Sequence, residues 1–239
     1  MSGEVLLGTG SAHKLAELRE ILGMAGPAIR FIGLQDLPQR PAEPDESGAS
    51  FEENATIKAR AYAAAAGMLS LADDSGLCVD ALGGAPGVHS AYFAGLPRDD
   101  AANNRKLVSL LAGVAPGRRT ARFVCVMVLA DAQGEILATT RGEVCGCIID
   151  EPRGHGGFGY DPHFVLVPEV ASASSPSGDW PVEALVRPEW VGRTTSELPN
   201  WAKNLVSHRG RAGRAMAERL RQIAARSPTG QAGVPEAEA

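Results

Sequence analysis

The chain has 239 residues, which is enough to bury a full hydrophobic core in one or two lobes. Its formal net charge of -5 at pH 7 argues against a general nucleic-acid or membrane binder, so we expect neither as a partner and any affinity for anions to be local. Four cysteines without a C-x-x-C pair, and no signal peptide or apolar run of membrane length, predict a cytoplasmic protein with reduced thiols and no zinc site.

Hydrophobic periodicity predicts alternating strands and helices along the chain. We expect strands at 5–9, 29–34, 69–73, 121–129, 136–149 and 163–167, and helices at 12–24, 51–67, 100–111 and 209–226. The segment Asp131-Ala-Gln-Gly134 predicts a hairpin turn between the two longest strands. This mixture of elements predicts an α/β protein with a mixed sheet.

The turn between the first strand and the first helix, Thr9-Gly10-Ser11, is a candidate phosphate site. Free N–H groups and the helix dipole at a helix N-terminus attract anions, and Lys14 lies one turn into the helix. The turn is not a Walker loop or a dinucleotide fingerprint, since no Gly-Lys-Ser/Thr ends it and His13 stands where a third glycine is needed. The alternative is that Ser11 is an ordinary N-cap and Lys14 is solvated.

The second predicted helix begins with Ser50 and, three residues later, Glu53, which is the pattern of a capping box. Glu53 therefore either ties back to the backbone amide of Ser50 or meets Asp74 across a gap and shares a divalent cation with it. Carboxylate oxygens, completed by water and substrate phosphates, are the ligands that Mg2+ prefers.

Two adjacent aspartates, Asp73 and Asp74, follow the apolar run 68–72, and we expect the strand to end there and the chain to turn at Gly76. Successive strand residues point to opposite faces, so we expect one aspartate to be structural and the other chemical. The alternative is that both solvate the strand end or that one caps the turn.

A glycine-rich segment from Gly154 to Pro162 formally contains G-x-G-x-x-G. It runs into a strand and opens no helix, so it does not fit a dinucleotide fingerprint. Because it carries Phe158 and Tyr160, we interpret it as a ligand-lining loop with a ring available to stack on a flat base. The alternative is a tight connection that needs several glycines with positive φ.

Six motifs together resemble those of the inosine/xanthosine triphosphate pyrophosphatases, which remove non-standard purine nucleotides from the pool. In chain order they are Thr9-Gly10 with Lys14, Phe51-x-Glu53-Asn54-Ala55, Ala72-Asp-Asp-Ser-Gly76, Gly83-Gly-Ala-Pro-Gly87, Gly156-Gly-Phe-Gly-Tyr-Asp-Pro162 and Ser207-His-Arg-Gly210. The resemblance covers the chain from about residue 5 to residue 226. It implies an elongated, curved, mixed β-sheet flanked by helices, two lobes with a central substrate cleft, and a homodimer.

The resemblance also implies an activity: hydrolysis of ITP, dITP or XTP at the α-phosphorus to the monophosphate and pyrophosphate, with Mg2+ as cofactor. Asp74 would act as the base on the attacking water and would bind Mg2+ together with Glu53. The triphosphate would be held by Thr9, Gly10, Ser11, Ala12, His13, Lys14 and Lys203, and Ser75 would touch the substrate. The base would be enclosed by Phe158, Gly159, Tyr160, Asp161, His208 and Arg209.

Two details of the site follow from hydrogen-bond chemistry. Ser11 stands where the family usually has Asn, so a substrate contact there is lost or taken by water. An arginine can donate to the 6-carbonyl of hypoxanthine or xanthine, whereas the 6-amino group of adenine would face it donor against donor. The alternative for the His208-Arg209 pair is a basic start to the final helix, whose remaining arginines we expect to be mostly solvated: Arg211, Arg214, Arg219 and Arg221.

We expect a single domain at residues 1–226 and a disordered tail at 227–239, which is rich in Pro, Gly, Ala and Glu. An inserted loop at about 170–193 has no counterpart in the typical family pattern. We expect this loop to pack over the cleft or at a dimer contact, because four of its apolar residues are costly to expose: Trp180, Leu185, Val186 and Trp190. Two other functions stay open, a related nucleotide pyrophosphatase with another base preference and a non-catalytic nucleotide-binding module.

Overall fold

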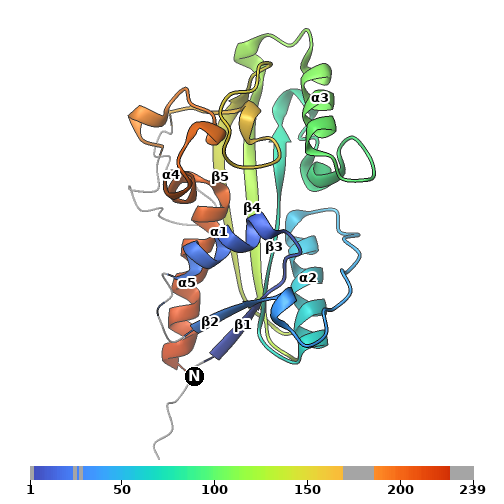
Figure 1. Ribbon diagram of the computed structural model, residues 1–239, viewed down its shortest axis with the longest axis vertical. Helices are drawn as coiled ribbons and strands as arrows, with labels where there is room; N and C mark the ends of the chain where they lie inside the picture. The colour runs from blue at the N-terminus through green and yellow to red at the C-terminus, as the bar shows by residue number, and fades with distance from the viewer. Residues whose placement is uncertain (1–2, 24–25, 27–28, 169–185, 227–239) are drawn as a thin grey trace, which may run out of the picture.

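The protein is built around one six-stranded mixed sheet, seen in a computed structural model that describes residues 3–23, 26, 29–168 and 186–226 (Figure 1). In spatial order the strands are β2 (Ile29–Gly33), β1 (Gly3–Leu7), β3 (Ser70–Val79), β4 (Thr120–Ala130), β5 (Ile136–Ile148) and β6 (Phe164–Leu166). β1 pairs in parallel with β2 and β3, and the remaining pairs are antiparallel. The predicted α/β fold with an elongated mixed sheet is confirmed.

The sheet is divided into two lobes because its outer strands are short. β1 pairs with β3 only through Leu6 with Ser70 and Leu7 with Leu71, whereas β3 continues to Val79. In Figure 1 the lower lobe therefore carries β1, β2 and α2 (Phe51–Ala66), and the upper lobe carries α3 (Asp100–Leu111) and β6. The long strands β3, β4 and β5 run through both lobes and join them.

Helices cover both faces of the sheet in the lower lobe. α1 (Ala12–Leu22) and α5 (His208–Arg226) share one hydrophobic cluster with β1, β3 and β4, while α2 packs on the opposite face. α5 lies very close to β5, since a Cβ on Gly142 would lie 2.5 Å from the backbone nitrogen of Ala212. None of the described helices is long and apolar enough to cross a membrane.

The prediction that the third strand ends at Asp73 and turns at Gly76 is wrong. β3 continues through Asp73, Asp74, Ser75 and Gly76 to Val79 and pairs with β4 along its whole length. A Cβ on Gly76 would lie 2.5 Å from the carbonyl oxygen of Gly87 in the 3-10 helix Gly87–Tyr92. The glycine therefore serves the close approach of that helix to the strand, which the local sequence does not reveal.

Other predicted elements agree with the structure, with small shifts at their ends. The hairpin turn between β4 and β5 is confirmed, since the Gly134 N–H donates to the Asp131 carbonyl over 2.9 Å. The short helix α4 (Asn200–Val206) was not predicted. Of the expected inserted loop, residues 170–185 lie outside the described residues, as does the tail at 227–239. Val186 and Trp190 are buried in the upper-lobe core and do not line the cleft, so this end of the loop packs inside its own lobe and not over the cleft.

Candidate active site

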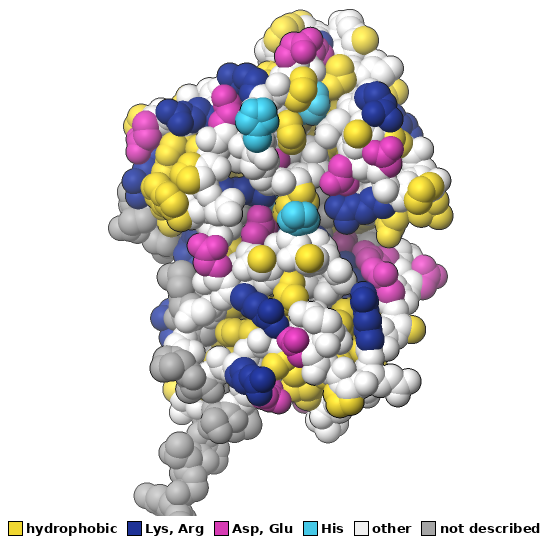
Figure 2. Space-filling view, viewed as in Figure 1, with side chains coloured by type: hydrophobic (Ala, Val, Ile, Leu, Met, Phe, Trp, Pro, Cys, Tyr) yellow, Lys and Arg dark blue, Asp and Glu magenta, His cyan; other side chains and the backbone are white. Residues whose placement is uncertain are grey.

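A cleft of about 780 Å³ lies between the two lobes. Its walls come from the turn after β1, the loop before α2, α2, β3, the 3-10 helix Gly87–Tyr92, the loop before β6, and the starts of α4 and α5. Figure 2 shows acidic and basic side chains interleaved across the middle of this face, where the lobes meet. Nearly all the site residues inferred from the sequence line this cleft. The exceptions are Ala12 and Glu53.

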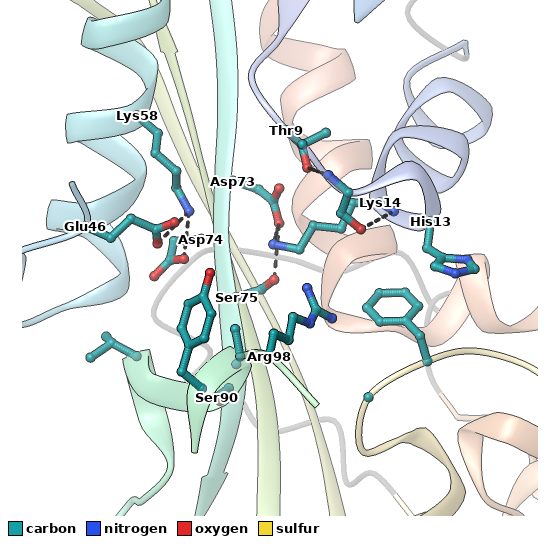
Figure 3. A pocket seen from close by; sticks show the side chains of 18 of the residues that line it. Thr9, His13, Lys14, Glu46, Lys58, Asp73, Asp74, Ser75, Ser90 and Arg98 are labelled. Carbon is teal, nitrogen blue, oxygen red and sulfur yellow. Dashed lines mark hydrogen bonds and ion pairs between the residues drawn. The ribbon is translucent and has the colours of Figure 1, made fainter. Parts of the chain in front are cut away.

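The two aspartates reach the cleft from opposite faces of β3. β1 pairs with β3 only at Ser70 and Leu71, so this edge of β3 is not covered by β1 beyond Leu71. Both Asp73 and Asp74 follow Leu71, and both line the cleft. In Figure 3 Asp73 points toward Lys14, and Asp74 points the other way, toward Lys58 and Glu46. Continuing the strand thus separates the two carboxylates into different surroundings.

Asp74 lies in surroundings that raise its affinity for a proton. Its Oδ1 accepts a hydrogen bond from Lys58 Nζ over 2.9 Å, and its Oδ2 is contacted only weakly by Asn54 at 3.4 Å. Burial raises the pKa of the Asp74 carboxyl to about 6, although the Lys58 ammonium acts in the opposite direction. A carboxylate with a pKa in this range is ionised at neutral pH and still accepts a proton readily.

Asp73 has the opposite electrostatic surroundings. It forms an ion pair with Lys14 at 3.1 Å, lies 3.5 Å from Arg209 and accepts a hydrogen bond from Ser75 over 3.1 Å. Although burial alone would raise it, the pKa of Asp73 is held well below its ordinary value by Lys14 and Arg209. Asp73 therefore stays ionised and forms ion pairs with cations from α1 and α5.

The turn before α1 is organised by its own hydroxyl groups. The Ser11 N–H donates to Thr9 Oγ1 over 3.2 Å, and Ser11 Oγ accepts from the Lys14 N–H over 3.4 Å. Ser11 is therefore the N-cap of α1, as one sequence interpretation predicted, and it also lines the cleft. The neighbouring His13 stacks on Phe158, with 5.6 Å between ring centroids.

The glycine loop that carries Phe158 is held from several sides. Its Gly159 N–H donates to Asp100 over 3.0 Å, and the Gly159 carbonyl accepts from Asn104 over 2.9 Å. Within the loop, Asp161 accepts from the Phe158 N–H over 2.8 Å. These bonds fix a ring at the cleft wall, as expected for a ligand-lining loop.

Lys203 lies in the cleft wall and is held there by two carboxylates. Its ammonium bonds Asp161 at 2.8 Å and Glu17 at 2.9 Å, and it lies 4.6 Å from the centroid of the Phe158 ring. Two carboxylates thus already neutralise the cation that the resemblance assigns to the triphosphate. Glu17, on α1, was not singled out from the sequence.

The His208-Arg209 pair is buried and is not a solvated start of the last helix. Arg209 is only 2% exposed and donates to Glu17 over 2.7 Å and to Ser75 over 2.9 Å. The His208 ring stacks on Phe123, and burial, aided by Arg209, holds the pKa of His208 well below its ordinary value, so the ring is neutral.

The expectation that the remaining arginines of α5 are mostly solvated is wrong at two positions. Arg211 is buried and donates to the Glu143 carbonyl, and Arg214 donates to the carbonyls of Asn204 and Leu205. These arginines tie α5 to β5 and to the end of α4.

Sequence reasoning missed the lysine that binds Asp74. Lys58, on α2, bonds both Asp74 and Glu46, the latter at 3.0 Å. Burial lowers the pKa of Lys58, but the charges of Asp74, Asp73 and Glu46 together raise it above its ordinary value. The available signal was spacing, because Lys58 follows Asn54 by four residues and so shares its buried helix face.

Glu53 lies away from this cluster. Its carboxylate accepts a hydrogen bond from the Ala49 N–H over 2.6 Å, and its own N–H donates to Ser50 Oγ over 3.1 Å. It borders a separate, small surface cavity with Ser47 and Ile57. Glu53 thus caps the start of α2, but its carboxylate binds the amide of Ala49 and not, as the capping-box interpretation had predicted, that of Ser50.

Comparisons with known proteins all point to the same family. A sequence profile of the Ham1 family matches residues 5–219. Proteins named dITP/XTP pyrophosphatase from Desulforamulus reducens and Nocardia farcinica are each 44% identical, over 92% and 93% of this chain and 96% and 97% of theirs. Among solved structures, a HAM1 protein from Coxiella burnetii has a TM-score of 0.74 at 34% identity, covering 92% of this chain and 98% of that one. The Ham1 protein of Staphylococcus aureus has a TM-score of 0.72 at 32% identity, covering 92% and 99%.

Proposed function

The chain belongs to the Ham1 family, and we propose that it hydrolyses non-standard purine nucleoside triphosphates, ITP, dITP and XTP, to the monophosphate and pyrophosphate. Such an enzyme cleanses the nucleotide pool. The observation that carries the proposal is the position of Asp74, a carboxylate with a pKa of about 6 that lines the same cleft as the Thr9–Lys14 turn and the Phe158 ring.

The proposed reaction is an attack of water on the α-phosphorus. Asp74 takes a proton from the water as its oxygen bonds to phosphorus, and the bond from the α-phosphorus to the bridging oxygen breaks, so that pyrophosphate leaves. Lys14 and Lys58, which line the cleft beside the two aspartates, oppose the negative charge that builds up on the phosphates.

Base selection is assigned to the upper wall of the cleft. Phe158 offers a ring for stacking, and the Arg209 guanidinium lies 5.6 Å from its centroid. A donor from Arg209 suits the 6-carbonyl of hypoxanthine or xanthine, whereas the 6-amino group of adenine would face it donor against donor. Sites built on such hydrogen bonds discriminate strongly, by roughly 10⁴ or more.

A divalent cation fits the charge of this cleft. Its lining carries more carboxylates than cations, namely Glu43, Asp45, Glu46, Asp73, Asp74, Asp100 and Asp161 against Lys14, Arg40, Lys58, Arg98, Lys203 and Arg209. A polyanionic substrate needs further positive charge there. No cluster of three or more His, Cys, Asp or Glu ligands occurs in the part of the chain that the structure describes. Substrate phosphates and water would then complete the coordination, as Mg2+ prefers, and the bound ion would neutralise the leaving pyrophosphate.

We propose that Asp74 is one Mg2+ ligand and that a second carboxylate assists it. Glu53 is the candidate inferred from the sequence, whereas Glu46 shares the Lys58 ammonium with Asp74 and lines the cleft. The geometry favours Glu46.

Two matched variants separate these ligands. Glu46→Gln should raise the Mg2+ concentration needed for half-maximal activity at least about tenfold, the effect of about 1.4 kcal/mol. Glu53→Gln should leave it unchanged, because an amide oxygen still accepts from Ala49. If Glu53→Gln raised this Mg2+ concentration and Glu46→Gln did not, the second ligand would be Glu53.

The activity itself is tested by pyrophosphate release from inosine, xanthosine, adenosine, guanosine and pyrimidine triphosphates with Mg2+. We expect kcat/KM to be highest for the first two. Preference for another base would favour a related pyrophosphatase, and binding without turnover would favour a non-catalytic module. We also propose a cytoplasmic homodimer, for which sedimentation should give twice the 24.9 kDa of one chain.

A further inference from the structure

Among the residues that the structure describes, one cation in the cleft has no partner. Five of the six Lys and Arg side chains that line it form ion pairs: Lys14 with Asp73, Lys58 with Glu46 and Asp74, Arg98 with Asp100, Lys203 with Glu17 and Asp161, and Arg209 with Glu17 and Asp73. The sixth, Arg40, makes no hydrogen bond or ion pair with any residue that the structure describes. Its charge is therefore available to a ligand.

Arg40 stands against the turn that precedes α1. A Cβ on Gly10 would lie 3.2 Å from Arg40 Nη2, so the missing side chain of this glycine lets the guanidinium approach the turn closely. Arg40 comes from the loop between β2 and α2, on the lower-lobe side of the cleft. It lies near Tyr62 of α2, since burial raises the pKa of that phenol and the charge of Arg40 acts against the rise.

The order of groups along the cleft indicates which part of the substrate Arg40 meets. Phe158 and Arg209 occupy the upper wall, where the base is assigned, and Asp74 on β3 faces the α-phosphorus. Arg40 is on the lower-lobe side of the cleft, beside Gly10 and near Tyr62, whereas the base is assigned to the upper wall. The phosphate farthest from the base is the terminal one.

We propose that Arg40 binds the terminal phosphate of the substrate and so favours triphosphates over diphosphates. This inference rests on the proposed pyrophosphatase function. A guanidinium suits the task because its planar fork of donors matches two phosphate oxygens. Because no carboxylate in the described part of the chain pairs with Arg40, the phosphate has no such partner to displace when it binds.

The test compares Arg40→Gln with the wild-type enzyme on inosine triphosphate and inosine diphosphate. Losing one charge-assisted contact should raise KM for the triphosphate about ten- to a hundredfold, with kcat little changed and the kinetics of the diphosphate unaltered. Arg40→Lys should recover part of the effect. Arg105→Gln is the matched control, since Arg105 lies on α3 outside the cleft lining with its side chain 72% exposed, and it should change neither substrate.

Binding of α,β-methylene analogues, in which carbon replaces the scissile bridging oxygen, supplies a readout that does not need turnover. Calorimetry should show Arg40→Gln weakening the triphosphate analogue by the same factor and leaving the diphosphate analogue unchanged. An equal loss for both analogues, or no loss for either, overturns the assignment of Arg40 to the terminal phosphate. A wild-type protein that binds these analogues but releases no pyrophosphate would instead refute the proposed function alone.

Discussion

Exchanging Asp74 for asparagine should mainly reduce activity, whereas exchanging Asp73 should mainly reduce stability. Asp74→Asn keeps the shape of the side chain but removes the proton acceptor. General base catalysis contributes roughly 10²–10⁴-fold, so kcat should fall by at least about a hundredfold, or about 2.7 kcal/mol in the barrier. Asp73→Asn should cost less activity, because its carboxylate anchors Lys14 and Arg209 and accepts no proton.

The stability of the Asp74 variant follows from its raised pKa. Burial moves this pKa from 3.8 to about 6, so the ionised carboxylate opposes folding by an amount on the order of 3 kcal/mol. The opposing contribution is absent below pH 4 and complete above pH 6, since the folded protein holds the proton more tightly. Asp74→Asn should therefore unfold at pH 7.5 with a free energy no lower than wild type, because Lys58 keeps its ion pair with Glu46.

Asp73→Asn should instead lower the unfolding free energy by about 3 kcal/mol, because it leaves the buried Arg209 short of an anion. Urea unfolding at pH 7.5 and pH 4, together with pyrophosphate release at saturating Mg2+, measures both variants. If Asp74→Asn kept more than about a tenth of the wild-type kcat, Asp74 would not be the base. If both variants lost the same stability, the division of roles between the two aspartates would be wrong.

Three further outcomes are expected. Below pH 6, kcat/KM should fall about tenfold per pH unit as Asp74 becomes protonated, and a profile flat down to pH 5 would contradict its role. Arg209→Lys keeps a cation for Asp73 but loses the planar donor fork, so the ratio of kcat/KM for inosine triphosphate to that for adenosine triphosphate should fall about tenfold. An equal fall in kcat/KM for both substrates would mean that Arg209 supports the structure and does not contact the base. Gly76→Ala should lower the unfolding free energy by about 1–3 kcal/mol, whereas Gly117→Ala, where a Cβ meets open space, should change it little, and equal effects would argue against close packing at Gly76.

Several features were predictable from the sequence because they depend on neighbouring residues. Apolar periodicity and capping residues located α1, α2, α3 and the β4–β5 hairpin, since each forms from contacts within a few residues. The glycine loop with Phe158 and the turn with Ser11 were recognised from composition and spacing, and both line the cleft. The family resemblance is confirmed by the match over residues 5–219.

The tertiary structure decided which charges meet. Lys58 and Glu46 are twelve residues apart, and Glu17 lies far along the chain from Lys203, so no local sequence pattern predicts these ion pairs. The end of β3 was misjudged because pairing with β4 extends the strand, whatever the polarity of Asp73 and its neighbour.

The sequence by itself determined most helices and strands, because these depend on residues close together in the chain, and its motifs carried the resemblance to the family. Only the fold determined that Asp73 and Asp74 differ in pKa. Lys14 and Arg209 lower the pKa of Asp73, whereas at Asp74 the effect of burial, which raises the pKa, is larger than the opposing effect of Lys58. Burial and long-range ion pairing set the charge state of a carboxylate, and neither exists until the chain has folded.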